Sequence, residues 1–375
     1  MLEIIPQGLH IDFVGKAKYF IALSLLLILL GAVSIVLHGG LNEGIDFSGG
    51  TLVQLHFAQP VDLGKVRDAL ETIGMGKGTV QYYYNIVNDK REVLIRVAQL
   101  PGEGHDIGKQ VQQALQEHLA GQTVDLRRVE VVGAQASSDL RRKALLALFY
   151  ATLGTVAYIS GRFEGKWIIS VSLAAILFVI TEGITQWLPG ISPAILIVVA
   201  LVASTAFNLA LQLRFALAAI VAIYHDILIT VSFLSLFNVE FDLQILAALL
   251  TITGYSLYDT IVVFDRIREN LRGQRRENFP VIVNDSINQT LSRTVLTSGH
   301  TLLVLLALFI LGGKVLHGFA FALLVGIMSG TYSTVFIASP ILVYWHNLAM
   351  RFQARGMSFT GARPPARRGS SGAAR

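Results

Sequence analysis

The chain has 375 residues, of which 53% are hydrophobic and only 15% are charged, and its mean hydropathy is +0.59. These values argue against a soluble globular protein and predict several membrane-spanning helices, each of which needs about 20 apolar residues. The absence of cysteine excludes disulfides, thiol catalysis and cysteine metal sites. The net charge of +5 fits the basic cytoplasmic loops of a membrane protein better than binding to nucleic acid.

The first apolar run covers residues 18–38 and follows Lys16 and Lys18. A cleaved signal peptide has an apolar core of about 7–15 residues and an A-x-A cleavage site. This run is longer and is not followed by such a site. Residues 1–38 are therefore predicted to be a cytoplasmic N-terminus and an uncleaved first transmembrane helix.

Residues 39–138 are more polar and show strand and helix patterns in the order βαββαβ. This order is typical of a small ferredoxin-like α+β domain, which we expect to be extracytoplasmic. The chain enters it through "GIDFSGGT", residues 44–51, a domain-entry motif that contains Gly44, Asp46, Gly49 and Gly50. No GK[ST] follows, so the motif predicts backbone turns before the first strand rather than a phosphate-binding loop.

Seven more apolar runs follow, and the fold class is predicted to be a polytopic α-helical protein of about eight spans, of which the later seven form a bundle at residues 139–348. The later spans are expected at residues 141–161, 166–188, 191–213, 215–237, 243–264, 292–312 and 316–346. Most basic residues between the spans fall on the side of Lys16 and Lys18, which is therefore predicted to be cytoplasmic. The cluster from Arg141 to Lys143 is the exception, because this topology places it outside. The basic tail, 349–375, is predicted to be disordered in the cytoplasm.

Two ionisable side chains stand inside the predicted spans on the cytoplasmic half. Asp259 lies within an apolar run, with Ser256 three and Tyr255 four residues before it, and Arg293 lies in the first turns of the span at 292–312. A charge at this depth is costly and usually faces the bundle interior, so we expect Asp259 and Arg293 to pair across helices. The pair predicts a proton relay in which a titrating carboxylate changes helix packing. The alternative is a pair that only holds two helices together.

Other polar residues carry weaker signals. Asp226 and His225 lie near the middle of the span at 215–237 and are candidate relay members, although His225 alone is more often a packed polar residue. The cytoplasmic end of the Asp259 helix carries a charged motif, Asp265, Arg266, Arg268 and Glu269. For this motif, interface anchoring and a functional role both remain open.

Three separated segments, "GIDFSGGTLVQL", "GYSLYDTIVVFDRIREN" and "INQTLSRTVLTS", resemble signature segments of the SecF family, which is part of the resistance–nodulation–division (RND) superfamily. The resemblance implies a multi-pass protein of the bacterial inner membrane with both termini in the cytoplasm. It implies action with SecD and with SecY, SecE and SecG, with YajC as a further candidate partner. The proton-motive force would promote the translocation of preproteins. The membrane carboxylate and the arginine of the family fall on Asp259 and Arg293.

The chain departs from the usual six spans of that family. About 50 residues, 165–213, form an insertion that supplies two more apolar helices, and its polar residues Glu182, Asn208 and Gln212 are expected to pack or snorkel. Two other functions stay open: half of an RND-type exporter of small molecules or lipids, and a non-transporting scaffold of the translocon. No hydrolase, redox or nucleotide motif is found, so we expect no enzyme activity, no cofactor and no metal site.

Overall fold

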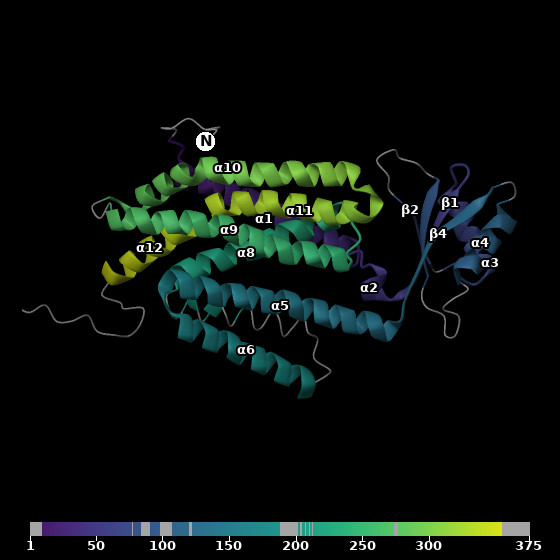
Figure 1. Ribbon diagram of the computed structural model, residues 1–375, viewed down its shortest axis with the longest axis horizontal. Coiled ribbons are helices and arrows are strands. Elements are labelled where there is room, and N and C mark those ends of the chain that lie inside the picture. The colour runs from purple at the N-terminus through teal and green to yellow at the C-terminus, as the bar shows by residue number, and fades with distance from the viewer. Residues whose placement is uncertain are drawn as a thin grey trace, which may run out of the picture.

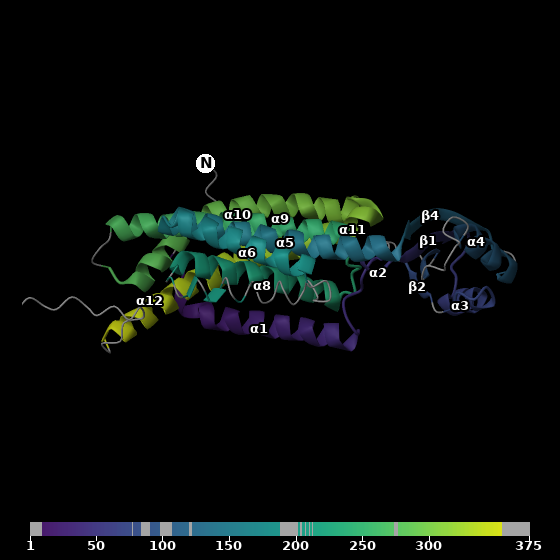
Figure 2. The same cartoon turned by 90° about the horizontal axis from the view of Figure 1, so that it is seen from below.

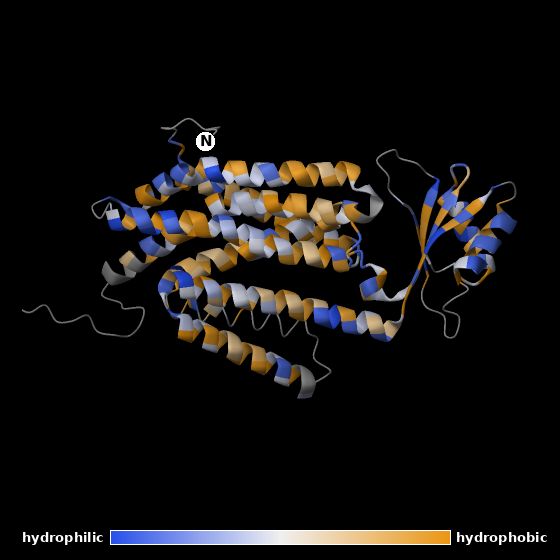
Figure 3. Cartoon of the chain, viewed as in Figure 1, coloured by the Kyte–Doolittle hydropathy of each residue, from blue (hydrophilic) through white to orange (hydrophobic). Residues whose placement is uncertain are grey.

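The computed structural model describes residues 10–76, 78–83, 91–97, 107–119, 122–187, 202, 205–206, 208–209, 211, 213–273 and 277–354. A long bundle of helices carries a small domain of strands and helices at one end, here called the sheet domain (Figure 1). Apolar residues cover most of the bundle, whereas polar residues are concentrated in the sheet domain and at the opposite end of the bundle (Figure 3). Most of the predicted span at 191–213 and the tail from 355 lie outside the described residues.

The sheet domain confirms the predicted βαββαβ order. Its elements are β1 (Gly50–Phe57), α3 (Leu63–Thr72), β2 (Thr79–Tyr82), β3 (Glu92–Val97), α4 (Ile107–His118) and β4 (Val124–Val132). The strands pair in the order β2-β3-β1-β4, and every neighbouring pair is antiparallel. Each helix crosses over one strand to reach the next, so the two β-α-β units interlock in the ferredoxin-like manner.

One core holds the sheet domain together. Alternate residues of β1 face the two helices, because successive side chains of a strand point to opposite faces of the sheet. Val53, Leu55 and Phe57 are fully buried and pack with the apolar stripe of α3 that contains Val66 and Leu70. Burial of such side chains stabilises a fold by roughly 1.5–3 kcal/mol each, which lets a domain of this size fold on its own core.

The bundle contains seven helices, within the described residues, that are long and apolar enough to cross a membrane. The helices of the bundle are α1 (Phe13–Leu37), α5 (Ala134–Glu164), α6 (Trp167–Trp187), α8 (Arg214–Leu236), α9 (Leu243–Gly273), α10 (Phe279–Leu311), α11 (Gly313–Ser333) and α12 (Ser339–Ala354). The seventh span, Leu316–Leu348, runs through both α11 and α12. The helices are longer than the predicted spans at 243–264 and 292–312, since α9 ends at Gly273 and α10 begins at Phe279. Hydropathy detects only the apolar part of a helix and misses a solvated extension.

The last predicted span, 316–346, is not one regular helix. A π-helical turn, η1 (Thr334–Ala338), separates α11 from α12, and Ser339 Oγ donates to the carbonyl oxygen of Thr334 at 2.8 Å. Insertions of this kind are rare and frequently occur at functional sites. Here the turn lies directly after the stretch of α11 that carries the hydroxyl groups described below.

Helix α6 belongs to the insertion and packs on the outside of the bundle against α5 (Figures 1 and 2). Tryptophans stand at both of its ends, Trp167 and Trp187, and both are exposed. Tryptophan is enriched at the two membrane–water interfaces, so the spacing of this pair fits a helix that crosses the bilayer at the edge of the bundle.

Candidate functional site

Asp226 lies at the centre of the bundle, on α8, and is only 1% exposed. Three serine hydroxyls donate to its carboxylate: Ser256 of α9 at 2.5 Å, and Ser329 and Ser333 of α11 at 2.7 and 2.8 Å. The Nδ1 atom of His225 lies 3.0 Å from Asp226 Oδ1. Four partners from three helices thus satisfy one buried carboxylate, as a charge in this environment requires.

His225 extends this network to α1. Its Nε2 atom lies 2.8 Å from Ser24 Oγ, and Ser24 Oγ lies 2.8 Å from the hydroxyl of Tyr332 on α11. The Tyr332 hydroxyl also donates to the carbonyl oxygen of Phe20. A continuous polar chain therefore joins the first helix to Asp226, although most of α1 is otherwise apolar.

Asp259 lies on α9 and is 3% exposed, so the structure agrees with its predicted burial. Ser298 of α10 donates to its Oδ2 atom at 3.1 Å, and the Oγ1 atom of Thr331 on α11 lies 2.7 Å from Ser298 Oγ. This carboxylate thus has a single direct hydrogen-bond donor among the described residues. Its surroundings differ sharply from those of Asp226, which lies on the other side of the same stretch of α11.

The expected direct ion pair between Asp259 and Arg293 is not formed. The guanidinium of Arg293 is exposed at the bundle surface, donates to the hydroxyl of Tyr258 at 2.6 Å and lies over the Tyr258 ring. It remains within electrostatic reach of Asp259, which neighbours Tyr258 on α9. The prediction failed because helical spacing places Arg293 at the correct depth but does not specify how α10 is rotated toward α9.

The two hydroxyl residues predicted to flank Asp259 are divided between sites. Ser256 bonds Asp226, whereas the hydroxyl of Tyr255 donates to Thr301 Oγ1 at 3.0 Å on α10. Ser256 therefore links the two carboxylates indirectly, since it bonds one and stands on the helix of the other.

The charged motif at the end of α9 links three helices, α5, α9 and α10. Asp265 pairs with Arg162 of α5 at 2.7 Å, and Arg266 bonds Gln289 of α10 at 2.6 Å and Glu269 at 2.7 Å. Arg268 also donates to a backbone carbonyl of α5. These contacts are exposed, and surface ion pairs of this kind contribute about 0–1 kcal/mol each. They favour a structural role for the motif.

The domain-entry motif joins the sheet domain to the loop between α8 and α9. The backbone N–H of Gly44 donates to the carbonyl oxygen of Phe241, and Asp46 Oδ2 accepts from the N–H of Leu243, the first residue of α9. A carboxylate at this position satisfies a free N–H and complements the helix dipole. Gly49 and Gly50 have φ values of 70° and 115°, which other residues rarely adopt.

Ion pairs reinforce this junction. Arg96 of β3 contacts Glu240 at 2.7 Å and donates to the carbonyl oxygen of Glu43 at 2.9 Å. Arg141 of α5 pairs with the Glu43 carboxylate at 3.0 Å. The unexpected basic cluster at 141–143 therefore lies at the sheet-domain end of the bundle, where its first member has an acidic partner. The loop that connects α8 to α9 is thus tied to the sheet domain at several points.

The acidic groups of the junction make its stability depend on pH. Burial raises the pKa of Glu240 above its usual value, and the charge of Arg96 opposes this shift. The folded protein then binds the proton more tightly than the unfolded chain, so the contribution of Glu240 to stability is greatest at low pH and decreases as the pH rises through the raised pKa. We expect the unfolding temperature of the wild-type protein to rise when the pH is lowered from 7. Glu240→Gln should reduce this rise.

Thermal unfolding measured over a pH series checks this expectation, with Glu130→Gln as the control. Glu130 is a glutamate of β4 in the adjoining sheet domain, and it pairs with Arg128 on the surface, so its replacement should leave the pH profile unchanged. Identical profiles for Glu240→Gln and the wild-type protein would contradict the assignment.

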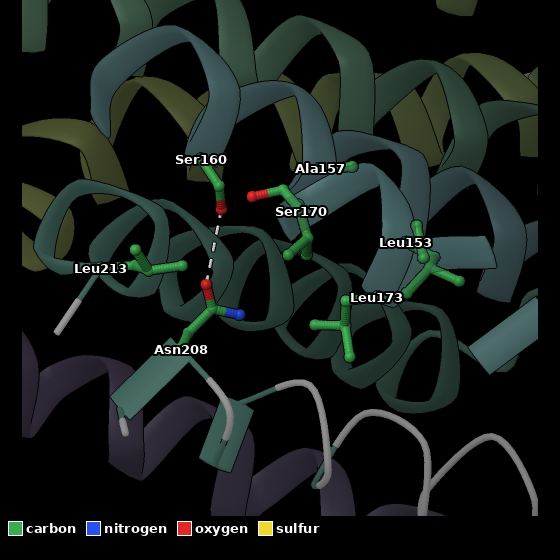
Figure 4. Close-up of a pocket in the computed structure, with 9 residues that line it drawn as sticks. Leu153, Ala157, Ser160, Ser170, Leu173, Asn208 and Leu213 are labelled. Carbon is green, nitrogen blue, oxygen red and sulfur yellow. Dashed lines mark hydrogen bonds between the residues drawn. The ribbon is translucent and has the colours of Figure 1, made fainter. Parts of the chain in front are cut away.

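The insertion meets the bundle at a small cavity between α5 and α6. Its lining includes Leu153, Ala157 and Ser160 of α5, Ser170 and Leu173 of α6, and Asn208 (Figure 4). Ser160 Oγ lies 3.5 Å from Asn208 Oδ1, and the Tyr150 hydroxyl donates to Glu182 at 2.9 Å. Glu182 and Asn208, the two described residues of the polar set predicted in the insertion, thus both contact α5 and, within the described residues, do not contact Asp226 or Asp259. Gln212 lies outside the described residues.

Sequence reasoning missed several hydroxyl residues of the site: Ser24, Ser298, Ser329, Thr331 and Ser333. A signal was present in "MSGTYST", residues 328–334, where small polar residues crowd into an apolar span. Such residues in transmembrane helices commonly mark contacts between helices. Their partners could not be assigned, because the sequence does not specify which helices are adjacent.

Comparisons with known proteins agree with this architecture. The chain matches the family described as "Protein export membrane protein SecD/SecF, C-terminal" over residues 110–203 and 191–348, and the "SecD/SecF GG Motif" over residues 35–61. It is 38% identical over 342 residues to the protein translocase subunit SecF of Desulfurispirillum indicum. This match covers 90% of this chain and 92% of the relative. The chain belongs to the SecF family.

Other relatives support the membership. The SecF subunit of Pseudomonas aeruginosa is 38% identical over 90% of this chain and 92% of its own length. The crystal structure of SecDF from Thermus thermophilus is 33% identical, with a TM-score of 0.65, and a super-membrane-facing form of SecDF is 31% identical, with a TM-score of 0.55. The matches cover 91% and 95% of this chain but only 39% and 41% of the SecDF chains. The SecF-family chain is therefore a multi-pass membrane protein that spans about two fifths of those structures.

Proposed function

We propose that this SecF-family chain is a proton-coupled subunit that promotes preprotein translocation through the SecY, SecE and SecG channel of a bacterial inner membrane. The observation that carries the proposal is Asp259, a buried carboxylate with one direct hydroxyl donor on a membrane-spanning helix. Ionisable groups within membrane spans are energetically costly and therefore rare. Where they occur, they usually mark a proton or ion pathway. A potential of 100 mV supplies about 2.3 kcal/mol for each charge that crosses.

The junction offers a route from the carboxylates to the sheet domain. Helix α8 carries Asp226, helix α9 carries Asp259, and the loop between these helices is bonded to Gly44, Asp46 and Arg96. A change in how α8 and α9 pack would therefore move the attachment points of the sheet domain. Movement of this domain on the extracytoplasmic side would act on the translocating chain.

The exposed position of Arg293 supports a partner within the membrane. An arginine with an exposed side chain in a span needs a polar environment, which lipid does not provide. Tyr258 and His300 are exposed on the same two helices. A homologous multi-span subunit, SecD, would cover this surface, and the solved relatives named SecDF are more than twice as long as this chain.

The test is Arg293→Ala and Arg293→Lys in vesicles that contain the complete export complex. We expect Arg293→Ala to reduce gradient-stimulated export at least about tenfold, and Arg293→Lys to retain part of it because the charge remains. Co-purification with a second multi-span subunit measures assembly. Normal export, or a loss of assembly alone, would favour a scaffold. Normal export with accumulation of a drug or lipid would favour an exporter.

A further inference from the structure

The bundle holds two buried carboxylates whose hydrogen bonds suit opposite tasks. We propose that Ser298 and Thr331 form a reversible hydroxyl pair that lets Asp259 gain and lose a proton, while Asp226 stays charged as a fixed anchor. This inference rests on the proposed proton-coupled function and identifies residues that position its titrating group.

Asp226 is bonded as an anion. Ser256 and Ser333 approach its Oδ2 atom, and Ser329 and His225 approach its Oδ1 atom. A carboxylate accepts up to about four hydrogen bonds, whereas a protonated acid must also donate one. Protonation would turn at least one of these donors into an acceptor. Ser333 has a second acceptor, the carbonyl oxygen of Gly330 at 3.2 Å, but hydrogen bonds from several donors to a carboxylate favour its charged form.

Asp259 has fewer donors: within the described residues only Ser298 donates to it, and Ser298 leads to a hydroxyl with two acceptors. Thr331 Oγ1 lies 2.7 Å from Ser298 Oγ and 2.9 Å from the carbonyl oxygen of Ile327. A threonine hydroxyl has only one hydrogen, so it donates to one of these two oxygens at a time.

These distances define two complete arrangements. When Asp259 is charged, Thr331 donates to Ser298 and Ser298 donates to the carboxylate. When Asp259 is protonated, its hydroxyl donates to Ser298, Ser298 donates to Thr331, and Thr331 donates to the Ile327 carbonyl. The two states differ by one proton on Asp259 and by rotation of two hydroxyl groups. Neither state leaves a hydrogen of the chain without an acceptor.

The surrounding charges are compatible with this exchange. Among the described residues, the ionisable groups on helices packed against this part of α9 include Arg293 and His300 of α10, Asp226 and His225 of α8, Arg162 of α5 and Tyr332 of α11. Asp226, His225 and Tyr332 bond one another through the network that includes Ser24, and Arg162 pairs with Asp265. The charge of Arg293 favours the charged form of Asp259, and the exposed side chains of Arg293 and His300 can respond to a partner.

Infrared spectroscopy of the purified complex in lipid nanodiscs tests the inference, since a protonated buried carboxyl group has its own carbonyl band. We expect one band that titrates with pH and is absent in Asp259→Asn. Thr331→Val removes the acceptor needed by the protonated state, so the midpoint of this band should move about one pH unit toward acid. Gradient-stimulated export should decrease by about five- to tenfold, and Thr331→Ser should restore both properties.

The matched control is Thr253→Val. Thr253 is a buried threonine of α9 whose hydroxyl donates only to its own helix, at Leu249, within the described residues. A wild-type midpoint in Thr331→Val, or a titrating band that persists in Asp259→Asn, would overturn the inference. If Asp259→Asn stops gradient-stimulated export but Thr331→Val leaves both export and the band midpoint unchanged, the hydroxyl-pair inference is rejected and the proposed function stands. If the bands behave as expected but Asp259→Asn exports normally, the proposed function fails and the hydroxyl pair stands.

Discussion

Asp259→Asn is expected to abolish the stimulation of protein export by a proton gradient while the protein still folds and assembles. Asparagine has nearly the shape of aspartate and can still accept the hydrogen bond from Ser298, so packing should be preserved. It cannot take up or release a proton. If proton transfer at this position drives the sheet domain, the stimulated component of export should decrease to the level without a gradient.

The measurement compares export into vesicles with and without an imposed gradient, at equal amounts of assembled complex. Asp265→Asn is the matched control, because it removes a carboxylate from the same helix at an exposed ion pair with Arg162. That pair contributes about 0–1 kcal/mol, so the control should export normally. Equal stimulation in Asp259→Asn and the wild-type complex would exclude Asp259 as the coupling group.

Asp226→Ala is expected to produce the largest loss of stability of any single replacement in the bundle. It removes the common acceptor of three serine hydroxyls and of His225, and all four of these residues are buried. Removing one partner from a buried charged site typically costs about 3–5 kcal/mol. Helices α8, α9 and α11 all meet at this carboxylate, so the loss should loosen their mutual packing.

Thermal unfolding in detergent measures this effect, with Asp259→Ala as the comparison. Within the part of the chain that the structure describes, Asp259 has one direct donor, so its removal should cost only about 1 kcal/mol of hydrogen bonding. The contrast between the two variants is the decisive quantity, since both replacements remove the same side-chain atoms. An equal loss of stability would contradict the assignment of Asp226 as the structural anchor.

The sequence alone determined the elements that depend on local patterns. Strand alternation and helix periodicity led to the βαββαβ domain, since the face that a side chain occupies follows from its position along one element. Apolar length led to the spans, because a helix must cross a fixed thickness of hydrocarbon. Burial of Asp226 and Asp259 followed for the same reason: lipid cannot satisfy a carboxylate in the middle of a span.

Only the tertiary structure decided which side chains meet. Arg293 was expected to bond Asp259 and instead reaches Tyr258, while Ser256 was expected beside Asp259 and instead bonds Asp226. The attachment of Asp46 to the start of α9 joins residues 197 positions apart. Such contacts depend on which helices are neighbours and how each is rotated about its axis. These properties are set by the packing of the whole bundle, so no single segment of the sequence contains them.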